Sequence, residues 1–250
     1  MLTNSQIIVL HTIKHGDNGL VVQAYSAISG RVALYLRISP KNKVILSNLH
    51  RLNILDVVTY SSSSSMPLIK EMVPALKLDS LRTNIYKNTI AIFLSELLVR
   101  CVRESESNPQ LYNFLASSIS MLEHIGDGVA NFHIHFMVHL SKMLGFMPSD
   151  NYSSDYPLFS IHSASFCEGN YYYDGHNCIL RESYDTGCFT SAESKLLHTL
   201  LNTRAIDLGD VKCSGELRLS FARQMVRYFS HHLGTAIEVK SLDVLHEVFN

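Results

Sequence analysis

HGDNGLVVQAYSAISGRVALYLRISPKNKVILSN, residues 15–48, is the stretch that decides the fold of the N-terminal part of the chain. Turn residues at 17–19 precede a short run of residues that favour strands, and Ser29-Gly30 interrupts that run. Beyond the break the apolar positions are Val32, Leu34, Leu36 and Ile38, and the positions between them are Arg31, Ala33, Tyr35 and Arg37. This period of two predicts a strand hairpin whose second strand buries one face and shows two arginines and a tyrosine on the other.

Positive charge is concentrated around this hairpin. Residues 1–52 hold six basic side chains and one acid, a net charge of +5, whereas residues 104–217 hold five basic side chains and fourteen acids, a net charge of −9. The whole chain has a net charge of −1 and a pI near 6.9. Any binding of a polyanion must therefore use a local patch and not a generally basic surface.

Length and composition indicate a globular protein of one large or two modest domains, since the chain has 250 residues of which 46% are hydrophobic. Its longest apolar stretch, 89–99, is interrupted by Glu96 and is too short for a membrane span. The first residues lack the pattern of a secretory signal, and five widely spaced cysteines form no disulfide framework. We expect a cytoplasmic protein with no membrane contact.

Two periodicities divide the chain. Five short strand-like segments fill residues 1–78, which predicts a small Greek-key barrel of the oligonucleotide-binding (OB) type. From Leu81 onward apolar residues recur three and four apart, which predicts a helical bundle over residues 79–250. The expected fold class is therefore α+β, with a barrel domain followed by a helical domain.

Residues 149–190 interrupt the helical pattern with many aromatic residues and a single basic residue, Arg181. We interpret them as an irregular or short-stranded insert that lies on the bundle. Thr190 or Ser191 is then expected to cap a helix, with Glu193 in its first turn. A final long helix is expected from about residue 214 to 233.

No motif of catalysis is present in the sequence. It contains neither a GxxxxGK[ST] phosphate loop nor a GxSxG nucleophile turn, and no cysteine lies in a known nucleophile signature. Histidine is the strongest signal for a metal-dependent enzyme, because His135 and His139 lie four apart near His133. However, the HFMVH sequence lacks the glutamate of HExxH, so partly buried or surface histidines are the plain alternative.

Four motifs follow one another along the chain: the GDxGxVVxxY-SG hairpin at 16–30, SELLxRxxxExExxxxLYxFL at 95–115, HFMVHLSKMLGFMPS at 135–149 and VRYFSHHLGTAIEVKSLDVL at 226–245. Together they resemble the bacterial RecO family of recombination mediators, which implies association with the nucleoid. This resemblance implies an OB barrel, a helical C-terminal domain and a non-enzymatic role in DNA repair and recombination. It implies binding of single- and double-stranded DNA, annealing of complementary strands, and work with RecR and the single-strand-binding protein so that RecA is loaded.

Two departures from the RecO pattern bear on binding. Many members carry a basic run after the third strand, where this chain has only RISPKNK at 37–43. Some members hold zinc on two Cys-x-x-Cys pairs in the insert, whereas here Cys167 and Cys178 stand alone. We therefore expect no cofactor and a lost zinc site; a site built from Cys167, Cys178, His162 and His176 has spacings that fit no standard zinc pattern.

Binding of nucleic acid requires cations on a face that also offers aromatic rings. The candidates on and beside the hairpin are Arg31, Tyr35, Arg37, Lys41 and Lys43. Tyr25 is ambiguous in its face, and Arg223 and Arg227 on the last long helix are candidates to extend the track. The alternative for each is a solvated surface.

Protein partners are the second class of function. Grooves of the helical domain are suited to a short apolar and acidic peptide, and the resemblance implies the C-terminal tail of the single-strand-binding protein. Guessed anchors for its carboxylates are Arg100, Arg103 and Lys142. The alternative function is therefore an adaptor that binds RecR and the single-strand-binding protein with little direct contact to DNA.

Overall fold

The computed structural model describes residues 1–38, 46–61, 66–169, 171–173, 178–180 and 187–249. It divides into two compact units, Met1–His124 and Ile125–Asn250. Within the described residues no helix combines the length and the apolar character needed to cross a membrane.

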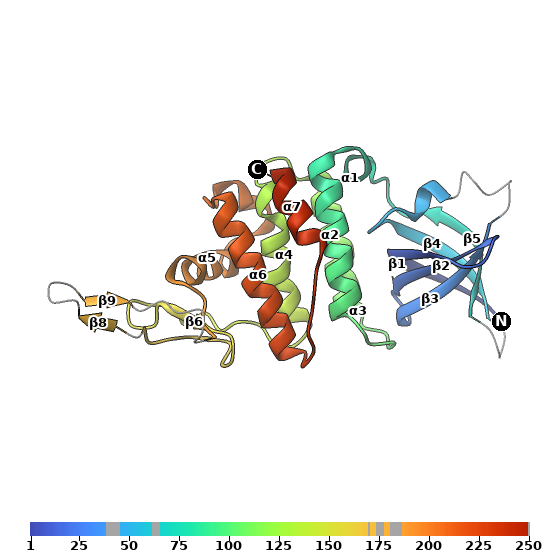
Figure 1. Ribbon diagram of the computed structural model, residues 1–250. Coiled ribbons are helices and arrows are strands. Elements are labelled where there is room, and N and C mark those ends of the chain that lie inside the picture. Colours follow the sequence, from blue (N-terminus) through green and yellow to red (C-terminus); the bar gives the residue numbers. More distant parts are fainter. Residues whose placement is uncertain (39–45, 62–65, 170, 174–177, 181–186, 250) are drawn as a thin grey trace. The chain divides into compact units, whose positions relative to one another are not determined.

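The first unit begins with a closed barrel of strands, which Figure 1 labels. The strands are β1 (Leu2–Lys14), β2 (Gly19–Ser26), β3 (Gly30–Arg37), β4 (Ile54–Tyr60) and β5 (Leu68–Pro74). Their order around the barrel is β1-β2-β3-β5-β4; all neighbours are antiparallel except β3 and β5, which meet in parallel at Tyr35 and Leu68. The predicted OB-type barrel is confirmed, because closure of five strands in this Greek-key order is that architecture.

The alternation of β3 works as predicted. Leu34 and Leu36 point into the barrel core, where they join buried residues of all five strands, and Val32 packs against that core. The intervening side chains, Tyr35 among them, therefore lie on the outer face of the barrel. Gly19 faces Arg37 across the β2–β3 pair, and Tyr25 faces Arg31.

Three helices complete the first unit: α1 (Asp79–Thr83), α2 (Ile85–Cys101) and α3 (Pro109–His124). Asn84 caps α2 by accepting from the backbone N–H groups of Tyr86 and Lys87. The strand β1 is buried on both faces, since Ile7 and Val9 fill the barrel and the oppositely directed Ile8 and Leu10 have no exposed surface. The hydroxyl of Ser95 on α2 donates to the Leu10 carbonyl, so α2 covers the outer face of β1.

The change from strands to helices falls between Pro74 and Asp79. The compact units divide elsewhere, between His124 and Ile125, whereas the sequence places a domain boundary at residue 78. Helices α2 and α3 belong to the first compact unit because they pack on the outer faces of β1 and β2, where they cover Ile8, Leu10 and Tyr25.

The second unit is helical, with α4 (Phe132–Met143), α5 (Ser191–Leu201), α6 (Gly215–His232) and α7 (Ser241–Phe249). Its described residues also include the 3₁₀ turns Val129–Asn131 and Ala205–Asp210. The predicted cap at Thr190 is confirmed as a capping box: its hydroxyl accepts from the Glu193 N–H, and the Glu193 carboxylate accepts from the Thr190 N–H. Glu193 is fully buried and also accepts from the Ser220 hydroxyl of α6.

The aromatic insert contains short strands, as the sequence indicates: β6 (Leu158–Ser160), β7 (Ser165–Cys167), β8 (Tyr171–Tyr173) and β9 (Cys178–Leu180). They form two separate two-stranded sheets. Phe159 attaches the first sheet to α6, because its ring centroid lies 5.5 Å from that of Tyr228 and 5.1 Å from that of Phe189. Phe159, Phe166 and Phe189 are therefore part of the core of the second unit, whereas Tyr156 is exposed.

Candidate nucleic-acid interface

Two of the predicted DNA-binding residues lie at the exposed end of β3. Tyr35 is half-buried, and its N–H donates to the Pro67 carbonyl at 2.8 Å, which fixes this part of β3 against the start of β5. Arg37 is exposed at the last position of the strand. Lys41 and Lys43, predicted to continue the track, lie outside the described residues.

Gly19 determines where the Tyr35 ring lies. A Cβ at residue 19 would stand 2.4 Å from the Tyr35 hydroxyl oxygen and 2.5 Å from the ring atom Cε2, closer than real atoms approach. The ring therefore lies across the beginning of β2, at a place that only glycine leaves open. The exposed His15 ring meets Tyr35 edge-on, with ring centroids 6.0 Å apart.

Arg31 does not share this exposed surface. Its Nη1 donates to the carbonyls of Val99 at 3.0 Å and Val102 at 2.9 Å, which are carbonyls of the C-terminal end of α2. Burial lowers the pKa of Arg31 from its ordinary value. The guanidinium thus caps a helix within the first unit, and we leave Arg31 out of the proposed DNA surface.

Tyr25, ambiguous in the sequence, is also covered. Only 1% of its surface is exposed, and its ring stacks on that of Tyr112 in α3 with centroids 6.5 Å apart. Tyr25 faces Arg31 across the β2–β3 pair, so one end of the outer face of the hairpin lies under helices. The other end, with Tyr35 and Arg37, remains open to solvent.

Two residues that sequence reasoning did not select extend this open end. Tyr60 at the end of β4 is 44% exposed, and the Nζ of Lys70 on β5 lies 5.7 Å from its ring centroid. Both Tyr60 and Tyr35 pair with Leu68, so β5 carries the surface from one tyrosine to the other. The sequence pattern that could have identified these two residues is a tyrosine and a lysine at outward strand positions on either side of the low-complexity serine run. The parallel β3–β5 contact that brings them near Tyr35 is a tertiary contact and has no local sequence pattern.

We name this open surface the Tyr35–Tyr60 face, defined by its five exposed or half-buried residues: His15, Tyr35, Arg37, Tyr60 and Lys70. Among the described residues Arg37 forms no ion pair, and Lys70 has the Tyr60 ring as its partner. Cations without a carboxylate partner are available to a phosphate, and the two phenol rings are available to an unpaired base.

Arg223 and Arg227 lie on α6 of the second unit, and both are exposed. Arg223 pairs with Asp243 of α7 at 3.1 Å, and the Nη1 of Arg227 donates to the Gln224 side-chain oxygen at 3.1 Å. They line a hollow of about 430 Å³ together with Glu216. These two residues therefore form a candidate surface of their own, in which carboxylates accompany the cations.

The guessed anchors for a partner peptide are distributed over both units. Arg100 and Arg103 lie at and just after the end of α2, whereas Lys142 lies in the last turn of α4. All three side chains are exposed. Arg100 and Arg103 can therefore act as neighbours, and Lys142 belongs to a different compact unit.

The histidines of α4 are directed toward the interior of the second unit. Burial lowers the pKa of His133 to about 3, with Arg218 as the second cause, and lowers that of His135 to about 4, with His139 as the second cause. The His135 Nε2 lies 2.9 Å from the Thr203 carbonyl oxygen. In the described part of the chain no group of three or more His, Cys, Asp or Glu side chains is placed to hold a metal ion.

The insert brings together Cys167 and Cys188, which the sequence does not pair. Their sulfur atoms lie 4.0 Å apart, and the Cys167 thiol donates to the Leu158 carbonyl oxygen at 3.2 Å. Burial, and then the neighbouring Cys188, raises the pKa of Cys167 to about 11. Of the residues weighed for zinc, His176 lies outside the described residues.

Comparison with known proteins gives one consistent result. Residues 82–242, well over half of the chain, match the family model described as "Recombination protein O C terminal". The chain is 28% identical over 253 residues to the "DNA repair protein RecO" of Azobacteroides pseudotrichonymphae and 29% identical over 253 residues to that of Christiangramia forsetii. It is 28% identical over 258 residues to that of Bacteroides fragilis; each alignment covers 100% of both chains.

Proposed function

The chain belongs to the RecO family, whose role is in DNA repair and recombination, and we propose that it fills this role as a mediator without enzymatic activity. It binds single- and double-stranded DNA and anneals complementary strands. With RecR and the single-strand-binding protein it promotes the loading of RecA. The observation that carries the DNA-binding part of this proposal is the Tyr35–Tyr60 face of the barrel.

The geometry of this face suits unpaired nucleic acid. Arg37 and Lys70 supply two cations at positions flanking the parallel contact between Tyr35 and Leu68. Cations that neutralise phosphates give affinity that depends on salt and not on sequence. Stacking of a base on an aromatic ring adds roughly 1–3 kcal/mol per base and tolerates any base. OB barrels bind oligonucleotides on the face of strands 2 and 3 and with the β1–β2 and β4–β5 loops. Tyr35 and Arg37 lie on β3, His15 lies in the β1–β2 loop, and Tyr60 directly precedes the β4–β5 loop.

Annealing follows from the same chemistry. A surface that neutralises the phosphates of two strands lowers their repulsion and leaves the base edges free to pair. Neither proton transfer nor nucleotide hydrolysis is needed, in agreement with the absence of a phosphate-loop motif from the sequence.

The test is annealing of two complementary labelled oligonucleotides, followed by fluorescence, with wild type and with Arg37→Glu/Lys70→Glu. We expect the double variant to lose at least tenfold in affinity for a single strand at low salt. The slope of log affinity against log salt should also become shallower, by about 0.7 for each phosphate contact removed. Arg100→Glu/Lys142→Glu is the matched control, since it changes the net charge by the same amount elsewhere and should anneal normally.

A second candidate function, an adaptor with little DNA contact, is favoured by one observation: Arg31, central to the predicted cationic strand, is occupied by α2. Unchanged DNA affinity in Arg37→Glu/Lys70→Glu would support the adaptor. The adaptor is supported further if the same variant still binds RecR or the tail of the single-strand-binding protein. Arg100→Glu/Lys142→Glu should then lose affinity for that tail.

A further inference from the structure

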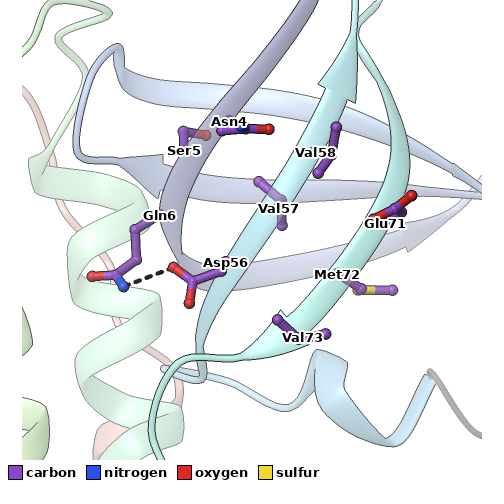
Figure 2. A pocket seen from close by; sticks show the side chains of 9 residues that line it. All are labelled: Asn4, Ser5, Gln6, Asp56, Val57, Val58, Glu71, Met72 and Val73. Atoms are coloured by element: carbon purple, nitrogen blue, oxygen red, sulfur yellow. Dashed lines mark hydrogen bonds between the residues drawn. The ribbon is translucent and has the colours of Figure 1, made fainter.

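A second surface of the barrel has the opposite charge. The outer faces of β1, β4 and β5 enclose a hollow of about 470 Å³, shown in Figure 2. Its outward side chains form two rows across the three strands: Gln6, Asp56 and Val73 in one row, and Asn4, Val58 and Glu71 in the other. The inward-facing Val57 and Met72 between them belong to the barrel core.

The hollow combines two carboxylates with aliphatic surface. Asp56 and Glu71 are both exposed, and no residue that lines the hollow is basic. Val73 is 59% exposed beside Asp56, so aliphatic surface lies next to a carboxylate. Among the described residues neither Asp56 nor Glu71 forms an ion pair.

Asp56 is held in place from behind. The Tyr112 hydroxyl of α3 donates to the Gln6 side-chain oxygen at 2.8 Å, and the Gln6 side-chain nitrogen donates to the Asp56 Oδ1 at 2.9 Å. The first bond fixes the orientation of the Gln6 amide, so that its N–H₂ group must face the carboxylate. The second oxygen of Asp56 remains available in a fixed orientation, and an acceptor that is already oriented loses less entropy when it binds a cation.

We propose that this hollow docks a segment of a partner protein in which a lysine or arginine stands next to an apolar side chain. The cation lies between Asp56 and Glu71, and the apolar side chain packs on Val58 and Val73. Charge complementarity selects this occupant: two carboxylates repel phosphates, and the described residues place no third metal-binding side chain here. The inference does not depend on DNA binding, because none of the residues that line the hollow belongs to the Tyr35–Tyr60 face, although Lys70 of that face precedes Glu71 on β5.

The first experiment selects binders to the full-length protein from a displayed library of random twelve-residue peptides at physiological salt. Selected peptides should contain Lys or Arg next to Leu, Val, Ile or an aromatic residue. A labelled synthetic copy of one such peptide is then titrated by fluorescence anisotropy. Selection of acidic or uncharged peptides, or of none, would overturn the proposal.

The variants locate the binding. Asp56→Asn/Glu71→Gln should lower the affinity for the peptide at least tenfold. Tyr112→Phe, which removes the hydrogen bond to Gln6, should lower this affinity two- to fivefold. The matched control is Glu104→Gln/Glu106→Gln, which removes two exposed carboxylates from the loop before α3 and should leave peptide affinity unchanged. Equal affinity in wild type and Asp56→Asn/Glu71→Gln would place the peptide elsewhere and refute the assignment.

Two further measurements keep the result unambiguous. Circular dichroism would reveal whether the double variant is unfolded. Val73→Thr preserves the shape of the residue and removes apolar surface, so it should lower the affinity for the peptide and provides an independent test. A labelled single-stranded oligonucleotide should bind Asp56→Asn/Glu71→Gln at least as tightly as wild type. Weaker oligonucleotide binding would assign the hollow to nucleic acid and reject a protein partner. Unchanged DNA affinity in Arg37→Glu/Lys70→Glu would argue against the Tyr35–Tyr60 face as a DNA surface but would not affect this inference.

Discussion

Arg31 and Arg37 lie on the same strand and on the same outer face of the barrel, yet they do different things. Arg31 donates two hydrogen bonds to carbonyls at the end of α2, and Arg37 is exposed at the strand end. Tyr25 and Tyr35 repeat the contrast: Tyr25 is buried against Tyr112, and Tyr35 borders solvent. Alternation thus determines which side of a sheet a residue faces, but it does not determine what covers that side.

The covering element is the segment that links α2 to α3. The Arg31 N–H donates to the Glu104 carbonyl at 2.9 Å, and the Ser107 hydroxyl donates to the Ala27 carbonyl at 3.1 Å. Through these bonds the linker runs against the β2–β3 turn. The turn end of the hairpin is therefore covered by the linker, and its other end is accessible to solvent.

The largest expected effect comes from removing the covered tyrosine. Tyr25→Ala should lower the free energy of unfolding by about 3–5 kcal/mol, because a large buried aromatic side chain is lost and a cavity remains. Tyr60→Ala, which truncates a 44% exposed ring, should stay within roughly 1 kcal/mol of wild type. Urea denaturation measures both. Equal losses would mean that α3 does not stabilise this end of the hairpin.

Glycine gives a second, somewhat smaller contrast. Gly30 and Gly16 have nearly the same positive φ, 63° and 64°. A Cβ at Gly30 would lie 2.2 Å from the Glu106 carbonyl oxygen, whereas a Cβ at Gly16 would have no heavy atom of another segment within 4 Å. Gly16→Ala should therefore cost only the left-handed strain, about 1–2 kcal/mol. Gly30→Ala adds a backbone clash, for a total of about 3 kcal/mol. Thermal unfolding distinguishes them, and similar melting temperatures would contradict the close approach of the linker.

The arginines give the smallest change in stability but the sharpest separation of roles. Arg31→Ala should destabilise the protein by about 2 kcal/mol, since hydrogen bonds to a charged group contribute roughly 1.5–3 kcal/mol. It should leave the salt dependence of DNA binding unchanged. Arg37→Ala should do the reverse, with stability near wild type and several-fold weaker binding. Urea titration measures the stability of both variants, and fluorescence anisotropy measures their DNA affinity. If both variants lost stability and DNA affinity to the same extent, the two arginines would not have separate roles.

Much of the fold could be predicted from the sequence, because it is encoded locally. The β3 strand follows from a strict period of two, and the α5 cap follows from Thr190 and Glu193 three residues apart. The short helix α1 and the burial of Ile8 and Leu10 were not predicted. These features depend on contacts between distant segments, for which a single sequence carries no periodic signal.

The candidate site was predicted only in part for the same reason. Tyr35 and Arg37 lie where the alternation places them, on an accessible outer face. Arg31 shares their periodicity, but its hydrogen-bond partners are 68 and 71 residues away in the chain. Tyr60 and Lys70 join Tyr35 only because β3 and β5 meet in parallel. That contact closes the barrel, and no local pattern announces it.

The sequence by itself determined most of the strands and helices, the sign of charge along the chain and the resemblance to the RecO family. Each of these depends on residue type and on spacing within one segment. Only the tertiary structure decided which cations are free and which cap a helix, and it alone gathered Asp56, Glu71 and Gln6 around one hollow. The reason is that accessibility and proximity are set by packing between distant segments, and packing is a property of the folded chain as a whole.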